Sequence, residues 1–174
     1  MLQTPRLEAL AVLVVDDSKH MCDLLAMMLR AFGIEQVIAC QDTESALTVL
    51  RRQTIDVIIT DLALPPVDGV QFIHALRWDS QSPAPFTPVL MVTGYSDRVR
   101  VEAARDAGIN EFLVKPVTPR ALFDRLVALI DAPRAFVRSP SYMGPDRRRR
   151  RVLNFSGPYR RTTDGQSGGG DLEL

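Results

Sequence analysis

The sequence predicts an α/β protein whose core is a five-stranded parallel sheet, doubly wound, with helices packed on both faces. Two observations predict this fold class. Short runs of consecutive apolar, often β-branched residues recur along the chain, which is typical of strands buried on both faces of a parallel sheet. Stretches in which apolar residues keep helical spacing separate these runs, and strands that alternate with helices form parallel sheets with right-handed crossovers.

The expected strands comprise residues 11–15, 36–40, 57–60, 89–92 and 111–114. A helix is expected after each strand, beginning near Ser18, Asp42 or Thr43, Gly69, Ser96 and Thr118. Hydroxyl and carboxylate side chains cap the free N–H groups of a helix, and Pro119 suits a first helical turn. Gly33 and Gly108 are expected to end the first and fourth helices. The fourth helix is expected to turn small residues inward: Ala103, Ala104 and Ala107.

Polar side chains stand where four of the expected strands end. Asp16 and Asp17 follow the first strand, Asp61 the third, Thr93 the fourth and Lys115 the fifth. A parallel sheet places all of these strand ends along one edge, where the ligands of such sheets bind. Two carboxylates ~4 Å apart repel by about 4 kcal/mol at an effective dielectric near 20. A hard divalent cation relieves that repulsion, and oxygen ligands with room for water favour Mg²⁺.

This arrangement indicates phosphoryl transfer onto a carboxylate, with the metal ion and a lysine stabilising the charge. The alternative for Asp61 taken alone is an ordinary capping or turn aspartate. Two other phosphate-binding folds are disfavoured, because neither Gly-x-Gly-x-x-Gly after the first strand nor Gly-x-x-x-x-Gly-Lys-Ser/Thr occurs in the sequence. A metal-dependent phosphatase is also disfavoured, since no second general acid stands beside Asp61.

From about Leu10 to Asp131 the chain resembles a bacterial response-regulator receiver domain of the CheY-like type. The motifs that carry the resemblance occur in register: the Asp16-Asp17 pair, Asp61 before the turn that ends in Asp68-Gly69, Thr93-Gly94 and Lys115-Pro116. The resemblance implies a flavodoxin-like fold with Asp61 as the phosphoacceptor. It implies that Asp17 and Asp61 bind Mg²⁺ directly, with the backbone carbonyl of Ala63, while Asp16 acts partly through water.

The resemblance also assigns roles to the last two strands. Lys115 would pair with the phosphoryl oxygens, and its peptide bond to Pro116 would be cis. Thr93 and Phe112 would form the switch pair that repositions an interaction face after phosphorylation. The implied protein accepts a phosphoryl group from a histidine kinase or a phosphotransfer protein. It would catalyse its own phosphorylation and dephosphorylation and otherwise would not be an enzyme.

Two departures from the family pattern bear on the lifetime of the phosphorylated state. Position 63 is Ala, where some fast-cycling relatives carry a polar residue that orients the attacking water. Tyr95, two residues after Thr93, is bulky and would shield the acyl phosphate. Both departures predict slow loss of the phosphoryl group.

The charge pattern divides the chain. Residues 1–131 carry 12 Lys and Arg against 17 Asp and Glu, whereas residues 132–174 carry 9 against 4. The expected organisation is a loose lead-in (1–9), an acidic receiver domain (10–131) and a basic, partly disordered extension (132–174).

The extension contains an arginine run with aromatic and aliphatic residues on either side. The run comprises Arg147, Arg148, Arg149, Arg150 and Arg151. Because it lacks the length and periodicity of a winged-helix or helix-turn-helix domain, we expect an arm that contacts protein: its own acidic domain, a second copy across a dimer, a kinase or an output partner. The alternative is a nucleic-acid-binding regulator that uses these arginines, which we disfavour.

Cysteine usage and hydropathy indicate the cellular compartment in which the protein is expected. Cys22 and Cys40 have neither metal-ligand spacing nor a disulfide pattern, so buried thiols in a reducing compartment are expected. No apolar run approaches ~18 residues and no basic region precedes an apolar core at the N-terminus. A cytoplasmic protein without a membrane span is therefore expected.

Overall fold

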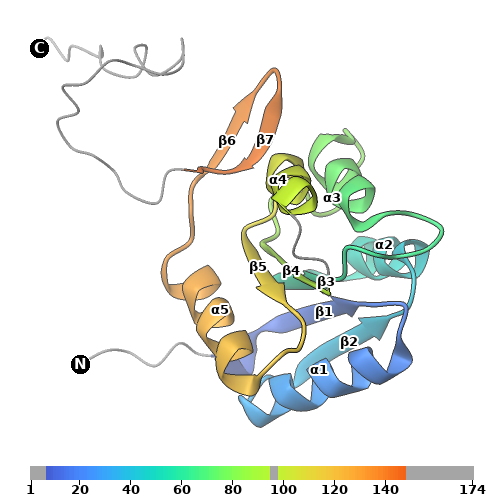
Figure 1. The fold of residues 1–174 in the computed structure, drawn as a ribbon, viewed down its shortest axis with the longest axis vertical. Coiled ribbons are helices and arrows are strands. Elements are labelled where there is room, and N and C mark those ends of the chain that lie inside the picture. Colours follow the sequence, from blue (N-terminus) through green and yellow to red (C-terminus); the bar gives the residue numbers. More distant parts are fainter. Residues whose placement is uncertain (1–6, 95–97, 148–174) are drawn as a thin grey trace, which may run out of the picture.

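The computed structural model describes residues 7–94 and 98–147 of the chain. Its centre is a five-stranded parallel sheet in the order β2-β1-β3-β4-β5 (Figure 1). The strands are β1 (Ala11–Val15), β2 (Gln36–Cys40), β3 (Val57–Thr60), β4 (Val89–Thr93) and β5 (Glu111–Val114). Every residue of β1, β3 and β4 is buried, which is why their sequences are uninterrupted apolar runs. The predicted fold class is confirmed.

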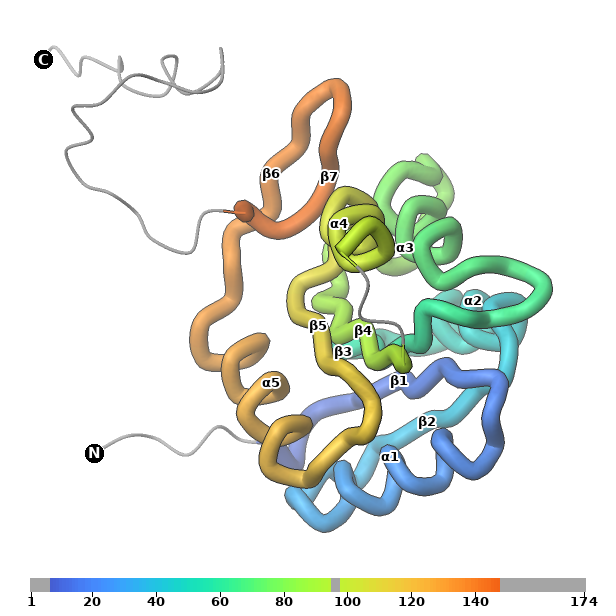
Figure 2. Tube along the Cα trace, viewed as in Figure 1, coloured from blue at the N-terminus to red at the C-terminus, as the bar shows by residue number. Residues whose placement is uncertain are grey.

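Helices cover both faces of the sheet (Figure 2). They are α1 (Lys19–Ala31), α2 (Thr43–Arg52), α3 (Gly69–Trp78), α4 (Arg98–Ala107) and α5 (Pro119–Asp131). The apolar residues of α1 and α5 share one core layer with the sheet, and those of α2, α3 and α4 share the other. The doubly wound topology therefore buries the sheet between two hydrophobic layers.

The predicted helix starts agree with the structure where it describes them. The side chains of Ser18, Asp42 and Thr118 each accept a hydrogen bond from a backbone N–H of the following turn. Ser96, the predicted cap of α4, lies outside the described residues. The prediction that Ala103 faces inward is wrong. The buried residues of α4 are Ala104 and Ala107, and the ~100° turn between successive residues leaves Ala103 at the solvent side of that face.

Two segments outside the five strands and helices are more ordered than the sequence suggested. Leu7–Ala9, expected within a loose lead-in, forms a 3₁₀ turn whose Leu7 side chain is buried in the α1–α5 core layer. Beyond α5, an antiparallel hairpin of β6 (Phe136–Ser139) and β7 (Tyr142–Pro145) packs against α3 and α4. We call residues 132–147 the arm. No helix among the described residues is long and apolar enough to cross a membrane.

The arm closes over the end of α4 at Gly108. This glycine has a φ of +104°, the left-handed conformation that ends a helix at low cost only for glycine. A Cβ atom there would collide with the carbonyl oxygen of Met143 on β7. Met143 itself is 5% exposed. The arm is therefore part of the packed domain.

Candidate functional site

Three carboxylates meet at the carboxyl edge of the sheet. Asp16 and Asp17 follow β1, and Asp61 follows β3, the neighbouring strand. One carboxylate oxygen of each lies within 4.8 Å of those of the other two. Asp16 and Asp61 are 1% and 7% exposed, while Asp17 is open to solvent. The structure thus brings together the three acids that the sequence placed at one edge.

Lys115 bridges two of these acids from the end of β5. Its ammonium donates to Asp61 Oδ2 at 2.7 Å and to Asp16 Oδ2 at 2.9 Å. Burial alone would lower the pKa of Lys115, but the hydrogen bonds and charges of Asp61 and Asp16 outweigh burial and raise the pKa above its ordinary value. Lys115 therefore remains a cation at neutral pH, and it offsets part of the repulsion among the carboxylates.

The loop after β3 holds the Asp61 carboxylate on its other side. The backbone N–H groups of Leu62 and Ala63 donate to Asp61 Oδ1 at 2.5 and 3.3 Å. Gly69 N–H donates to the Leu62 carbonyl at 2.8 Å and thereby folds the loop back on itself. A Cβ atom on Gly69 would collide with the carbonyl oxygen of Asp61. Glycine is therefore required there for the close approach of the two backbone segments.

The remaining predicted site residues lie on β4 and β5. Thr93, at the end of β4, is fully buried, and its carbonyl accepts a 2.8 Å hydrogen bond from Lys115 N–H. Phe112 on β5 is partly buried against the α2–α3–α4 core layer. The Lys115–Pro116 peptide bond is cis, as the resemblance implies. Tyr95, which was predicted to shield the acyl phosphate from water, lies outside the described residues.

The donor set fits a hard divalent cation. Three carboxylates from two adjacent strand ends converge, and the most exposed of them, Asp17, leaves access for water ligands. Asp61 Oδ1 accepts from both Leu62 and Ala63, whereas Oδ2 accepts from Lys115 alone and retains a lone pair, since each carboxylate oxygen offers two. Asp17 and Asp61 are the residues that would hold such an ion, together with the Ala63 carbonyl and, through water, Asp16.

A buried thiol supports the Asp16 backbone from behind. Cys22 Sγ on α1 donates to the Asp16 carbonyl at 3.3 Å and to the Cys40 carbonyl at 3.6 Å. Both cysteines are free and buried, as predicted. Burial raises the pKa of each thiol, so both remain protonated at neutral pH. The sequence predicted the burial of Cys22 but not its contact with the strand end that carries Asp16.

The sequence analysis missed Arg77, a buried cation at the opposite end of the sheet. Arg77 is 1% exposed, and its guanidinium donates to the carbonyls of Gly108, Pro85 and Thr87 at 3.2, 2.9 and 2.8 Å. It also lies 4.9 Å from the ring centroid of Phe136 in the arm. Burial lowers the pKa of Arg77 to about 10, which leaves it charged at neutral pH. On an amphipathic helix an arginine ordinarily predicts exposure, so no local signal revealed this one.

Of the predicted arginine run, the structure describes Arg147 alone. Its guanidinium pairs with Asp106 of α4 at 2.7 Å and stacks 4.0 Å from the ring centroid of Tyr142. Arg148, Arg149, Arg150 and Arg151 lie outside the described residues. Nearer α5, Arg134 donates to the Asn110 carbonyl and lies 3.7 Å from Glu111 of β5. Two of the three described basic residues of the arm, Arg134 and Arg147, thus contact the acidic domain itself.

A doubly wound sheet with converging acids, a bridging lysine and a buried threonine at one edge defines the class of phosphoacceptor switch domains. The model of the response regulator receiver domain family matches residues 12–127. The chain belongs to this family, and it is a receiver domain followed by a C-terminal extension.

Known relatives agree with that assignment. Chemotaxis protein CheY of Pseudomonas aeruginosa is 30% identical over 120 residues, which cover 69% of this chain and 95% of that protein. DNA-binding response regulator MtrA of Mycobacterium tuberculosis is 32% identical over 117 residues, which cover 67% of this chain and 49% of MtrA. The chain thus spans about half the length of the MtrA regulators. A solved structure of Vibrio cholerae CheY4 superposes with a TM-score of 0.62 at 34% identity and covers 68% of this chain and 97% of that one.

Proposed function

We propose that the chain is a phosphorylation switch that receives a phosphoryl group on Asp61 and thereby changes a protein-interaction face. One observation carries the proposal: the Asp61 carboxylate lies beside Asp16 and Asp17 and is held by Lys115. This arrangement presents a carboxylate nucleophile in a site that concentrates positive charge on incoming phosphoryl oxygens. The donor would be a phosphohistidine of a histidine kinase or of a phosphotransfer protein.

In the transfer step, an oxygen of the Asp61 carboxylate forms a bond to phosphorus while the bond from phosphorus to the donor breaks. The donor leaves with the electron pair of that bond. The Lys115 ammonium, which already reaches Asp61 Oδ2, would follow the charge onto the phosphoryl oxygens. Mg²⁺, held by Asp17, Asp61 and the Ala63 carbonyl, would supply the remaining charge neutralisation.

The switch would act through Thr93 and Phe112. Thr93 stands at the end of β4, the strand that pairs with β3, which Asp61 follows, and Phe112 is aligned with Met91 in the β4–β5 pair. Two new hydrogen bonds to a charged phosphoryl group would contribute ~3–6 kcal/mol. A shift in population from 1:99 to 99:1 requires about 5.5 kcal/mol. The upper part of that range therefore suffices to bury Phe112 and reposition α4 completely, and the lower part shifts the population only in part.

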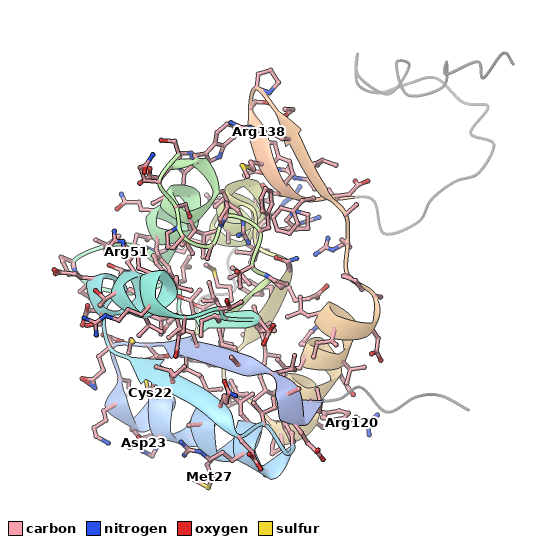
Figure 3. The ribbon with its side chains drawn as sticks, turned by 180° about the vertical axis from the view of Figure 1, so that it is seen from behind. Cys22, Asp23, Met27, Arg51, Arg120 and Arg138 are labelled. Carbon is pink, nitrogen blue, oxygen red and sulfur yellow. The ribbon has the colours of Figure 1, made fainter. Side chains whose placement is uncertain are left out.

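The decisive experiment is the Asp61→Asn variant, which keeps the size of the side chain but removes the nucleophile. Incubation with acetyl phosphate and Mg²⁺ is expected to add one phosphate per wild-type chain and none to Asp61→Asn, as measured by intact-mass spectrometry. Asp17→Ala, which removes a metal ligand, is expected to remain unlabelled too. The matched control is Asp23→Asn, an isosteric change at an exposed aspartate of α1 (Figure 3). Full labelling of Asp61→Asn would refute the assignment.

The output is proposed to be a contact with another protein or with a second copy, made in the cytoplasm. What supports a protein-contacting arm is that Arg134 and Arg147 already pair with acidic residues of the domain, Glu111 and Asp106. No described residue favours the nucleic-acid alternative. That alternative has a sharp signature, because neutralisation of about five phosphates gives a log–log salt slope near −4.5. A duplex-binding titration at 50 and 200 mM salt tests it directly.

A further inference from the structure

A small cavity lies where the arm meets the receiver domain. It has a volume of about 60 Å³ and opens between α4, β5 and β7. The side chains that matter here are Arg105 and Phe112 of the domain, Glu111 at the start of β5, and Arg134, Tyr142 and Arg147 of the arm. None of the acids at the phosphoacceptor site lines the cavity. It is therefore a second location, built from both parts of the chain.

The cavity is positively charged, because its one lining carboxylate is already neutralised. Glu111 accepts from Arg125 of α5 at 3.0 Å and lies 3.7 Å from Arg134. Arg105 makes no ion pair with any residue of the described chain. Arg147 pairs with Asp106, whose side chain is 67% exposed and therefore well screened by solvent. Three arginines and one compensated carboxylate thus line this space.

One donor in the cavity wall is incompletely used. The Nε atom of Arg147 is buried and donates to no group among the described residues. A buried donor without an acceptor costs about 1–3 kcal/mol, more when it is charged. The stacking of Arg147 on Tyr142 holds the guanidinium plane in place. The orphaned donor belongs to a residue that lines the cavity, so an acceptor supplied by a ligand there would be favourable.

We propose that this cavity binds the phosphate group of a small anionic ligand. The planar guanidinium group of arginine can donate two parallel hydrogen bonds to the oxygens of a phosphate group. It is also less strongly hydrated than an ammonium group, so it suits a partly buried anion site. The cavity volume of about 60 Å³ is several times the roughly 10–15 Å³ that a single water requires, so the cavity admits an occupant larger than water. Two of the arginines come from the arm, so the site exists only while the arm is docked.

The position of the cavity also couples it to the switch. Phe112, which lines it, is the aromatic residue proposed to move after phosphorylation, and this coupling alone rests on the proposed function. Coupling between two binding sites is reciprocal, so phosphorylation would change the affinity for the ligand by the same factor that the ligand changes the phosphorylation equilibrium.

The test uses the full chain without Mg²⁺ and two probes, inorganic phosphate and glycerol phosphate. Isothermal titration calorimetry measures affinity, and amide NMR locates the site. Arg105→Gln and Arg147→Gln are each expected to weaken phosphate binding at least tenfold. Arg138→Gln is the matched control, because Arg138 is exposed on β6 of the hairpin (Figure 3) and does not line the cavity. Equal binding of both probes shows that the site recognises the phosphate group and accepts an ester, tighter binding of glycerol phosphate identifies a phosphate ester as the ligand, and binding of the inorganic ion alone identifies free phosphate.

Three results would overturn the site. They are an absence of binding, amide shifts confined to the loop after Asp61, and an equal loss of affinity in Arg105→Gln and Arg138→Gln, which would indicate diffuse attraction. Arg105 is exposed, so its substitution leaves the fold intact and keeps the test meaningful if Arg147→Gln unfolds the arm. Titration after treatment with beryllium fluoride and Mg²⁺ tests the coupling. An unchanged affinity for phosphate would refute the coupling but not the binding site. Labelling of Asp61 is measured separately, so failure of the proposed function can be distinguished from failure of the site.

Discussion

The two ends of the central sheet bury charge in opposite ways. At the carboxyl edge, Asp16 and Asp61 are crowded carboxylates that share one ammonium, Lys115, and they stay under-neutralised until a second cation binds. At the other end, Arg77 is a buried cation whose donors reach three backbone carbonyls and whose plane is covered by Phe136. In the first arrangement, the remaining repulsion between the carboxylates favours binding of the cation that phosphoryl transfer requires. In the second arrangement, the donors of Arg77 are paired with backbone carbonyls, and the arrangement stabilises the fold.

This contrast predicts different responses to substitution. Removal of an acid at the carboxyl edge should alter chemistry strongly and stability weakly, because repulsion is lost together with attraction. Changes at the Arg77 end should alter stability strongly and phosphoryl transfer weakly, because no residue there approaches Asp61.

The largest expected effect is that of Arg77→Ala. It leaves the carbonyls of Gly108, Pro85 and Thr87 without their charged donor and opens a cavity beneath the arm. We expect the free energy of unfolding to fall by about 3–5 kcal/mol, as for other broken buried charge networks. Urea denaturation measures it, with Arg51→Ala, an exposed arginine of α2, as the control. Equal transition midpoints for the two variants would contradict a structural role for Arg77.

Removal of the arm should be the next largest effect. A chain that ends at Asp131 exposes the surface that Met143 and Phe136 cover, and full burial of one such side chain contributes about 1.5–3 kcal/mol. The entropy regained by the freed arm offsets part of this, so we expect a loss of about 2–4 kcal/mol. A chain that ends at residue 147 keeps the arm and is the control. Both truncated chains should still be phosphorylated by acetyl phosphate. Loss of phosphorylation in the chain that ends at Asp131 would show that the two ends of the sheet are not independent.

The sequence revealed these two regions unequally, for a physical reason. The acids, Thr93 and Lys115 were predictable because each directly follows a buried strand, and topology alone brings parallel strand ends together. The fold class and the strand bounds follow from the same periodic patterns. The arm gave no comparable signal, because its turn at Ser139–Tyr142 lacks the Asn-Gly or Gly residues that mark tight hairpins. Burial of Arg77 depends on three segments distant in sequence, which no local pattern contains.

A smaller effect, dependent on metal and pH, is expected for Lys115→Ala. Without Mg²⁺ the variant leaves three carboxylates uncompensated, so the free energy of unfolding should fall by about 1–3 kcal/mol. Millimolar Mg²⁺ should restore most of this loss, since the ion supplies the missing positive charge. Lys19→Ala, at an exposed ion pair of α1, keeps the site intact and should respond to Mg²⁺ only as much as the wild type does. A deficit in Lys115→Ala that Mg²⁺ does not reduce would contradict the electrostatic account.

The pH dependence of wild-type stability follows from the same lysine. Because the folded pKa of Lys115 is raised above the value of 10.5, its contribution is fully present below pH 10.5 and is lost as pH rises through the folded pKa. In the absence of Mg²⁺, the stability difference between wild type and Lys115→Ala should therefore be constant at neutral pH and shrink in the alkaline range.

The smallest effect concerns the lifetime of the phosphoryl group, at Ala63. Its N–H donates to Asp61 Oδ1 at 3.3 Å, so position 63 adjoins the phosphoacceptor, and a methyl side chain offers no hydrogen bond to an attacking water. In Ala63→Asn the amide can orient that water, and one such bond at about 0.5–1.5 kcal/mol corresponds to a ~2- to 10-fold faster hydrolysis. Loss of label from the phosphorylated chain after the phosphodonor is removed gives the rate. Val137→Asn, an equally polar change on the exposed side of the arm, should leave the rate unchanged, because it alters the end of the sheet remote from Asp61. Equal rates for wild type and Ala63→Asn would mean that water reaches the acyl phosphate without help from this side chain, and the slow cycle expected from Ala63 would have to be abandoned.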